Sequence, residues 1–124
     1  ERLADELQRE LARTGDTLDV LLQVNASGEA SKHGCAPELA AALLEHVLGE
    51  CALLRVRGLM AMGPLHGDPA PVFTRVAALA AELRRRSGLP LDVLSLGMSG
   101  DLAAAIHAGS TLVRVGSAIF GARE

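Results

Sequence analysis

Short apolar runs alternate with longer segments of helical periodicity along the whole chain, and this alternation narrows the possible folds more than any other feature. Four runs predict strands: residues 18–25, 54–62, 91–96 and 111–116. Four segments predict helices: residues 2–13, 37–48, 68–86 and 101–108. Strands that alternate with helices of about 8–18 residues are typical of βαβ crossovers and a parallel sheet. The sequence therefore predicts an α/β fold in one domain.

The spacing of apolar and polar residues supports these assignments. The first predicted helix carries leucine at every fourth position with charged residues between, which is the pattern of an amphipathic helix. The first predicted strand alternates, with polar Gln23 and Asn25 on one face and valines on the other. Pro37 stands at the predicted first position of the second helix, and Gly49 is predicted to end it.

Composition excludes several classes of protein. With 49% hydrophobic residues in 124, the chain is not disordered, and its net charge of −3 gives no basic face for nucleic acid. No apolar run approaches the ~20 residues of a membrane span, and no signal peptide opens the chain. Cys35 and Cys51 are too few and too poorly spaced for a disulfide framework or a metal site. We therefore expect a cytoplasmic protein without a structural metal. Because Glu1 lies inside a predicted helix, we also expect a piece of a longer protein.

Glycine and serine follow two successive predicted strands. Ser99 comes after the strand at 91–96 and precedes a helix, which it is predicted to cap. Gly116 and Ser117 follow the strand at 111–116. Free N–H groups at such turns, together with a helix dipole, bind anions. The sequence therefore predicts a phosphate site formed by two neighbouring loops.

Two architectures fit this pattern. Four strands and four helices can form a small open α/β layer, or half of an eightfold barrel. In barrels the phosphate site commonly lies after strands 7 and 8, which favours the barrel. An isolated half barrel leaves two exposed sheet edges, which is a liability.

Four segments match one family in order and spacing: residues 24–34 (VNASGEASKHG), 58–62 (GLMAM), 94–99 (LSLGMS) and 109–121 (GSTLVRVGSAIFG). On these motifs the chain resembles the pyridoxal-phosphate homeostasis (YggS/PROSC-like) family. The resemblance implies the C-terminal half of a (β/α)8 TIM barrel of the alanine racemase N-terminal domain type, with residues 1–124 as a partial barrel domain of about four βα units. It also implies the cofactor pyridoxal 5′-phosphate (PLP). The family's N-terminal half, which carries the Schiff-base lysine, has no counterpart in this sequence.

The resemblance also assigns the site. Ser99, Gly116 and Ser117 would hold the phosphate of PLP, with Met98 beside it, and Arg114 would face the pyridine nitrogen. A permanently charged guanidinium opposes protonation of that nitrogen, and an unprotonated pyridine is a weaker electron sink. Such a site suits a carrier, and also a racemase with strong flanking bases. Without the resemblance, Arg114 is an arginine at a strand end that reaches water.

The function implied is PLP binding and homeostasis, as a carrier or buffer of this form of vitamin B6 without established turnover. This chain would supply the half of the site that contacts the phosphate and the pyridine. Its partners would be PLP, PLP-dependent apoenzymes and the N-terminal half of the same barrel. The alternatives are a PLP-dependent racemase-like enzyme and a half-barrel interaction module without a ligand.

Two further hypotheses concern single residues. Gly97-Met98-Ser99 partly matches the G-x-S-x-G nucleophile elbow of hydrolases, but Asp101 occupies the fifth position, and only His107 follows as a base. Lys32, the one lysine in the sequence, is either a Schiff-base partner for PLP or a solvated side chain that contacts Glu29.

Overall fold

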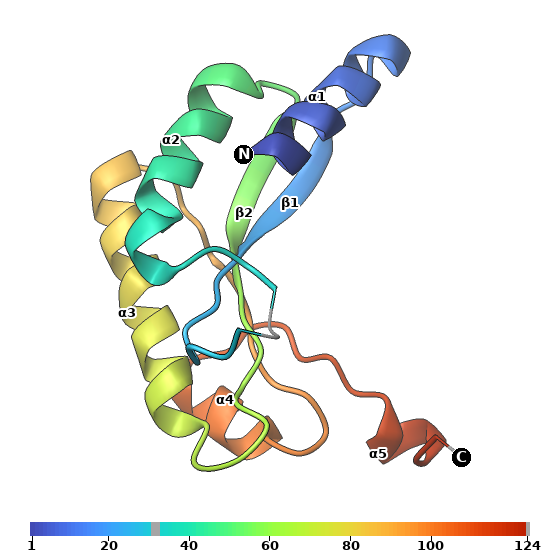
Figure 1. Ribbon diagram of the computed structural model, residues 1–124, viewed down its shortest axis with the longest axis vertical. Helices are drawn as coiled ribbons and strands as arrows, with labels where there is room; N and C mark the ends of the chain where they lie inside the picture. The colour runs from blue at the N-terminus through green and yellow to red at the C-terminus, as the bar shows by residue number, and fades with distance from the viewer. Residues whose placement is uncertain (31–32, 124) are drawn as a thin grey trace.

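A parallel sheet with helices on one of its faces forms the centre of the computed structural model, which describes residues 1–30 and 33–123 (Figure 1). Its elements in chain order are α1 (Arg2–Thr14), β1 (Leu18–Gln23), η1 (Pro37–Leu39), α2 (Ala40–Glu50), β2 (Leu54–Met60), α3 (Ala70–Ser87), β3 (Val93–Ser95), α4 (Leu102–Ala108) and α5 (Ser117–Phe120). The strands lie in the order β1-β2-β3, and both pairs are parallel. The predicted α/β fold with a parallel sheet is confirmed.

The prediction of a strand at residues 111–116 is wrong, because this segment forms no regular strand. Only Leu112 forms a bridge, to Ser95 of β3. The backbone N–H of Leu94 donates to Thr111 Oγ1 at 2.8 Å, and that of Leu96 donates to Ser110 Oγ at 3.3 Å. Hydroxyls thus replace the carbonyl acceptors of a regular ladder. The segment therefore follows β3 without continuing the sheet.

Two predicted helix boundaries also need correction. Pro37 begins the 3₁₀ turn η1, and α2 follows it from Ala40. Gly49 does not end α2, which continues to Glu50 because the Cys51 N–H still donates to the Val47 carbonyl at 2.9 Å. By contrast, Gly15 and Gly88 do end their helices in the left-handed conformation that glycine adopts at low cost.

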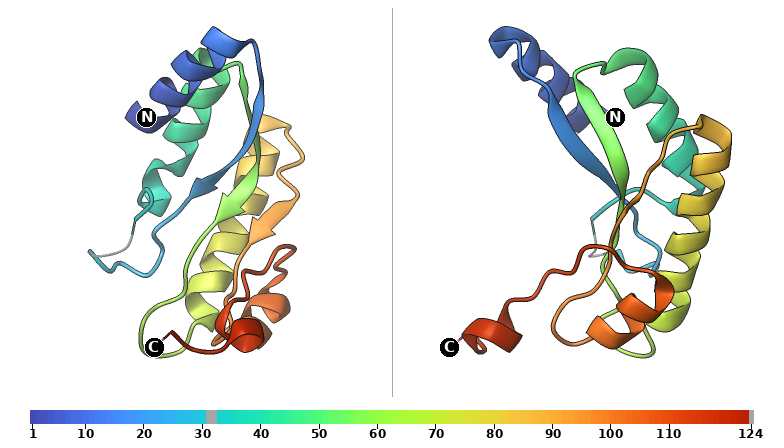
Figure 2. Two further views of the ribbon diagram at one scale, coloured as in Figure 1. Left: turned by 90° about the vertical axis from the view of Figure 1, so that its right-hand side faces the viewer. Right: turned by 180° about the vertical axis from the view of Figure 1, so that it is seen from behind.

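The core lies between the sheet and helices α2 and α3, which cover the same face (Figures 1 and 2). Its largest buried side chains include Phe73, Leu59, Leu83, Val24 and Val47. On β1 and β2 outside this core, Asp19 pairs with Arg55 at 2.9 Å and with Arg57 at 3.2 Å, and all three side chains are about half exposed. Both views in Figure 2 show no helix over the opposite face of the sheet.

A bulge in β2 sets the register of the sheet. Val20 pairs with Val56, but Leu21 pairs with Gly58, so Arg57 is an extra residue. Such a bulge reverses which alternate residues face the core, and Leu59 and Ala61 are accordingly buried. Gly58 then meets Val93 so closely that a Cβ atom on Gly58 would lie 1.7 Å from the Val93 carbonyl oxygen. Only glycine fits this position without moving β3.

Gly58→Ala is expected to lower the free energy of unfolding by about 1–3 kcal/mol or more, because overpacking a core typically costs that much and the obstructing atom belongs to the backbone. Gly49→Ala is the matched control. Gly49 lies in α2 with open space where a Cβ would be, so alanine is expected to add about 0.5–1 kcal/mol of helix stability. Denaturant unfolding measures both, and equal stability of the two variants would contradict the assigned β2–β3 approach.

Candidate anion-binding site

The loop after β3 and the segment that ends in α5 meet at the carboxyl end of the sheet. The Ala118 N–H donates to Ser99 Oγ at 3.0 Å, and the Arg114 N–H donates to the Gly97 carbonyl at 2.9 Å. Gly97 has φ +100°, and a Cβ there would lie 2.5 Å from the Ala105 Cβ. Glycine at 97 thus allows the turn that brings Ser99 to α5. The two loops are neighbours, as the sequence predicts.

An open pocket of about 600 Å³ lies between these loops. Its lining contains all five residues that the sequence analysis selected. The lining residues are Met98, Ser99, Gly100, Arg114, Gly116, Ser117, Phe120, Gly121 and Arg123. Two of them are arginines and none is acidic, so the lining carries the charge that an anionic ligand requires.

Several main-chain donors in the two loops have no partner. Within residues 1–30 and 33–123, the N–H groups of Ser99, Gly100, Gly116 and Ser117 make no hydrogen bond. Others are already used, since the Met98 N–H donates to Asp101 Oδ1 at 2.8 Å. The residues that line the pocket thus carry four amides that bond to no other part of the described chain.

The sequence predicts that Ser99 caps the following helix, and this prediction is wrong. Asp101 directly precedes α4, and no side chain caps the helix. The Ser99 oxygen instead accepts from Ala118, 19 residues later. In the part of the chain that the structure describes, Ser99 Oγ makes no hydrogen bond to a histidine, so the geometry gives the hydrolase hypothesis no general base.

Arg114 crosses from its own segment to the end of β2. Its Nη2 donates to the Ala61 carbonyl at 2.9 Å, and its Nε is buried without a hydrogen-bond partner among the described residues. A buried N–H without an acceptor costs roughly 1–3 kcal/mol. Arg114 is thus held in place with one donor that a ligand acceptor would satisfy.

Polar residues at the end of β1 and just after it order the following loop. Gln23 Nε2 donates to the His33 carbonyl at 3.3 Å, and Asn25 Nδ2 donates to the Glu29 carbonyl at 2.9 Å. Glu29 in turn accepts from the Leu65 N–H at 3.1 Å. Lys32, the predicted Schiff-base or solvated lysine, lies outside the described residues.

The sequence analysis missed four lining residues: Gly100, Phe120, Gly121 and Arg123. Arg123 carried no pattern that marks a ligand contact, and Phe120 belongs to a short helix, α5, that the sequence did not predict. Among the described residues, every helix is too short or too polar to span a lipid bilayer.

Ser99→Ala is expected to speed hydrogen exchange of the Ala118 amide about fivefold, because a single hydrogen bond contributes roughly 1 kcal/mol to local protection. The Arg114 amide, which donates to Gly97 instead, serves as the internal control and is expected to exchange at an unchanged rate. NMR-detected exchange measures both amides. Unaltered protection of Ala118 would mean that Ser99 does not join the loops.

Comparison with known proteins gives one family for the whole chain. The family model described as "Alanine racemase, N-terminal domain" matches residues 1–124. The chain is similar to the pyridoxal phosphate homeostasis protein of Pseudomonas aeruginosa, with 48% identity over 128 residues that cover 99% of the chain and 53% of the relative. The corresponding mouse protein is 42% identical over 131 residues, which cover 99% of the chain and 48% of the relative. The chain thus spans about half the length of these curated relatives.

Solved structures give the same result. The structure of PipY from Synechococcus elongatus without PLP superposes with a TM-score of 0.88 at 33% identity, covering 97% of this chain and 57% of PipY. PipY with PLP bound gives a TM-score of 0.84 at 32% identity, with the same coverage. These matches confirm the resemblance that the four sequence segments predicted, and with it the alanine racemase-type fold, of which the chain is about half.

Proposed function

The chain belongs to the family of the alanine racemase N-terminal domain, and from this membership we propose that it binds the phosphate and the pyridine ring of PLP as one half of a (β/α)8 barrel. The observation that carries the proposal is the pair of joined loops, whose four partnerless amides stand in a pocket with two arginines. The similarity to PipY, which has a structure with PLP bound, supports the same ligand.

Ser99, Gly116 and Ser117 are the proposed phosphate contacts. A dianionic phosphate ester accepts several hydrogen bonds at once, and amides and hydroxyls from two adjacent loops supply them. Arg123, also in the lining, adds a positive charge, and the half-exposed Met98 gives an apolar contact beside the phosphate.

Arg114 is the proposed contact of the pyridine nitrogen. Its unsatisfied Nε fits an acceptor, and an unprotonated ring nitrogen is one. Because the guanidinium keeps its charge, it holds that nitrogen unprotonated. When bound, PLP supplies an aldehyde and an electron-withdrawing ring. By keeping the ring nitrogen unprotonated, Arg114 makes the ring a weaker electron sink. The arrangement therefore favours holding PLP as a carrier or buffer over turning over an amino acid.

The other half of the barrel is the proposed structural partner. The uncovered sheet face (Figure 2) and the exposed apolar side chains of Leu18, Leu112 and Val113 suit burial against further strands. That half would supply the lysine that attaches PLP, and PLP-dependent apoenzymes in the cytoplasm would receive the cofactor.

The test is a titration of the intact protein, with both halves present, by PLP and by pyridoxal, which lacks the phosphate. Ser99→Ala/Ser117→Ala is expected to weaken PLP binding about 100-fold or more, since each of the two lost hydrogen bonds to a charged group is worth roughly 1.5–3 kcal/mol. Pyridoxal binding is expected to change little. Absorbance of the bound cofactor, checked by equilibrium dialysis, gives both affinities.

Thr14→Ala is the control, because Thr14 lies at the end of α1, outside the pocket, and its hydroxyl donates to the Leu11 carbonyl. Equal PLP affinity of the wild type and the double variant would contradict the assignment of Ser99 and Ser117 as phosphate contacts. Equal loss for PLP and pyridoxal would show damage to the fold instead.

A further inference from the structure

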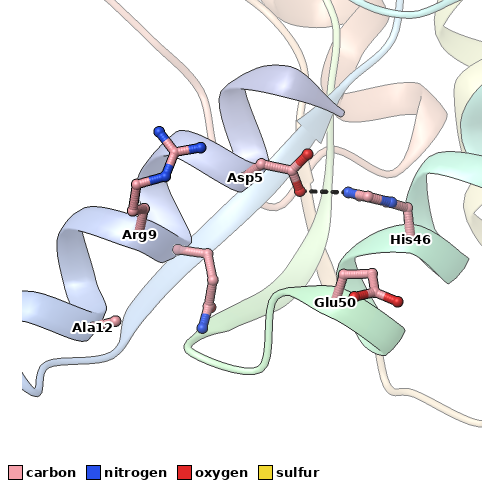
Figure 3. Close-up of a pocket in the computed structure, with 6 residues that line it drawn as sticks. Asp5, Arg9, Ala12, His46 and Glu50 are labelled. Carbon is pink, nitrogen blue, oxygen red and sulfur yellow. Dashed lines mark hydrogen bonds and ion pairs between the residues drawn. The ribbon is translucent and has the colours of Figure 1, made fainter.

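Three side chains converge on one carboxylate oxygen at the junction of α1 and α2, far from the anion pocket. Asp5 comes from α1, His46 from α2, and Cys51 directly follows α2. His46 Nε2 lies 2.6 Å from Asp5 Oδ1, and Cys51 Sγ lies 3.6 Å from the same oxygen. The dashed line in Figure 3 marks the contact between His46 and Asp5. The three donor atoms all lie within 4.8 Å of one another.

This cluster is closed on one side and open on the other. Cys51 is fully buried, whereas the side chains of His46 and Asp5 are 22% and 45% exposed. Asp5 and His46 line an open pocket of about 590 Å³ together with Gln8, Arg9, Ala12 and Glu50 (Figure 3). A small ion from solvent can therefore reach the Asp5 and His46 side chains through this pocket.

The donor set has a specific chemistry. Sulfur, imidazole nitrogen and carboxylate oxygen are together the ligands of Zn²⁺, whereas Ca²⁺ and Mg²⁺ take oxygen ligands alone. The charged groups around the cluster do not repel a cation, because the positive charge of Arg9 in the pocket lining is balanced by the negative charge of Glu50. Gln8 is unavailable as a ligand, since its Oε1 accepts from the Leu53 N–H at 2.9 Å.

We propose that Asp5, His46 and Cys51 form a binding site for a zinc-type divalent cation, with the fourth coordination position open to water in the pocket. Tetrahedral zinc, with Zn–S about 2.3 Å and Zn–N and Zn–O about 2.0–2.1 Å, places the sulfur about 3.5 Å from the oxygen and the nitrogen about 3.3 Å from it. The observed S···O distance of 3.6 Å already agrees. The N···O distance of 2.6 Å widens when the partly exposed Asp5 and His46 rotate around the ion.

Metal binding replaces a proton on the thiol. The Cys51 thiol donates to Asp5 Oδ1, so it carries its proton in the metal-free protein. The cation takes up the sulfur as a thiolate, and the S–H proton leaves to solvent. No bond other than S–H breaks, and no oxidant or reductant is required.

The test is a titration of the metal-free, reduced protein with Co²⁺, which occupies zinc sites and reports thiolate ligation through a near-ultraviolet charge-transfer band. One equivalent of Co²⁺ is expected to develop the band, and Zn²⁺ is expected to abolish it by displacement. Cys51→Ser is expected to remove the band. Cys35→Ser is the matched control and is expected to retain it, because Cys35 lies in the loop after β1 and outside the cluster.

Asp5→Asn and His46→Gln are each expected to weaken Co²⁺ binding about tenfold or more, the size of effect known even for groups that only support metal ligands. His107→Gln, on α4, is expected to bind as the wild type does. A folded wild type without the band, or a band lost in Cys35→Ser but kept in Cys51→Ser, would overturn the proposal.

A second measurement does not depend on the folding of the Cys51 variant. Zn²⁺ is expected to raise the midpoint of thermal unfolding of the wild type above its value in chelator, because a ligand of the native state stabilises it. The shift is expected to disappear in His46→Gln. An identical midpoint with and without Zn²⁺ in the wild type would count against the site.

Discussion

The close approach of β2 and β3 at Gly58 determines the position of everything beyond it in the sheet. The bulge at Arg57 brings Gly58 opposite Val93, after which Leu59 pairs with Leu94 and Met60 with Ser95. The Ala61 N–H then donates to the Ser95 carbonyl, and the Ala61 carbonyl accepts from Arg114. The arginine of the anion pocket is therefore placed by a backbone contact that only a residue without a side chain permits.

Hydroxyl groups hold the last part of the chain where a regular strand does not form. Ser110 and Thr111 accept hydrogen bonds from the N–H groups of Leu96 and Leu94, and Ser99 accepts one from the N–H of Ala118. Because the segment does not continue the ladder, the amides of Gly116 and Ser117 are left without partners inside the described chain. Irregular backbone at this edge is thus what leaves donors for an anion, as is common where loops at the carboxyl ends of parallel strands form sites.

The two proposed sites depend on different contacts. The anion pocket lies between loops at the end of the sheet near α4 and α5, whereas the Asp5–His46–Cys51 cluster lies where α1 meets α2, at the opposite end in Figure 1. Their chemistry also differs, since free amides and arginines suit a phosphate, and sulfur, nitrogen and carboxylate donors suit a soft cation. An ion at one end would therefore stabilise helix packing without taking part in the binding of PLP.

The sequence by itself determined the order of the main helices and of three of the four predicted strands, the parallel sheet, the family and five of the nine residues that line the anion pocket. The elements and the two glycine–serine loops follow from local periodicity and from the residues placed after strands, which neighbouring residues decide. The family, and with it Met98 and Arg114, follow from the resemblance of four segments to that family. Tertiary structure alone decided that 111–116 is no regular strand, that Ser99 bonds to Ala118 instead of capping α4, and that Gly49 does not end α2. It also decided that Asp5 meets His46 and Cys51, because Asp5 is more than 40 residues away from both along the chain. Such contacts arise only when helices pack, and no spacing along the chain encodes them.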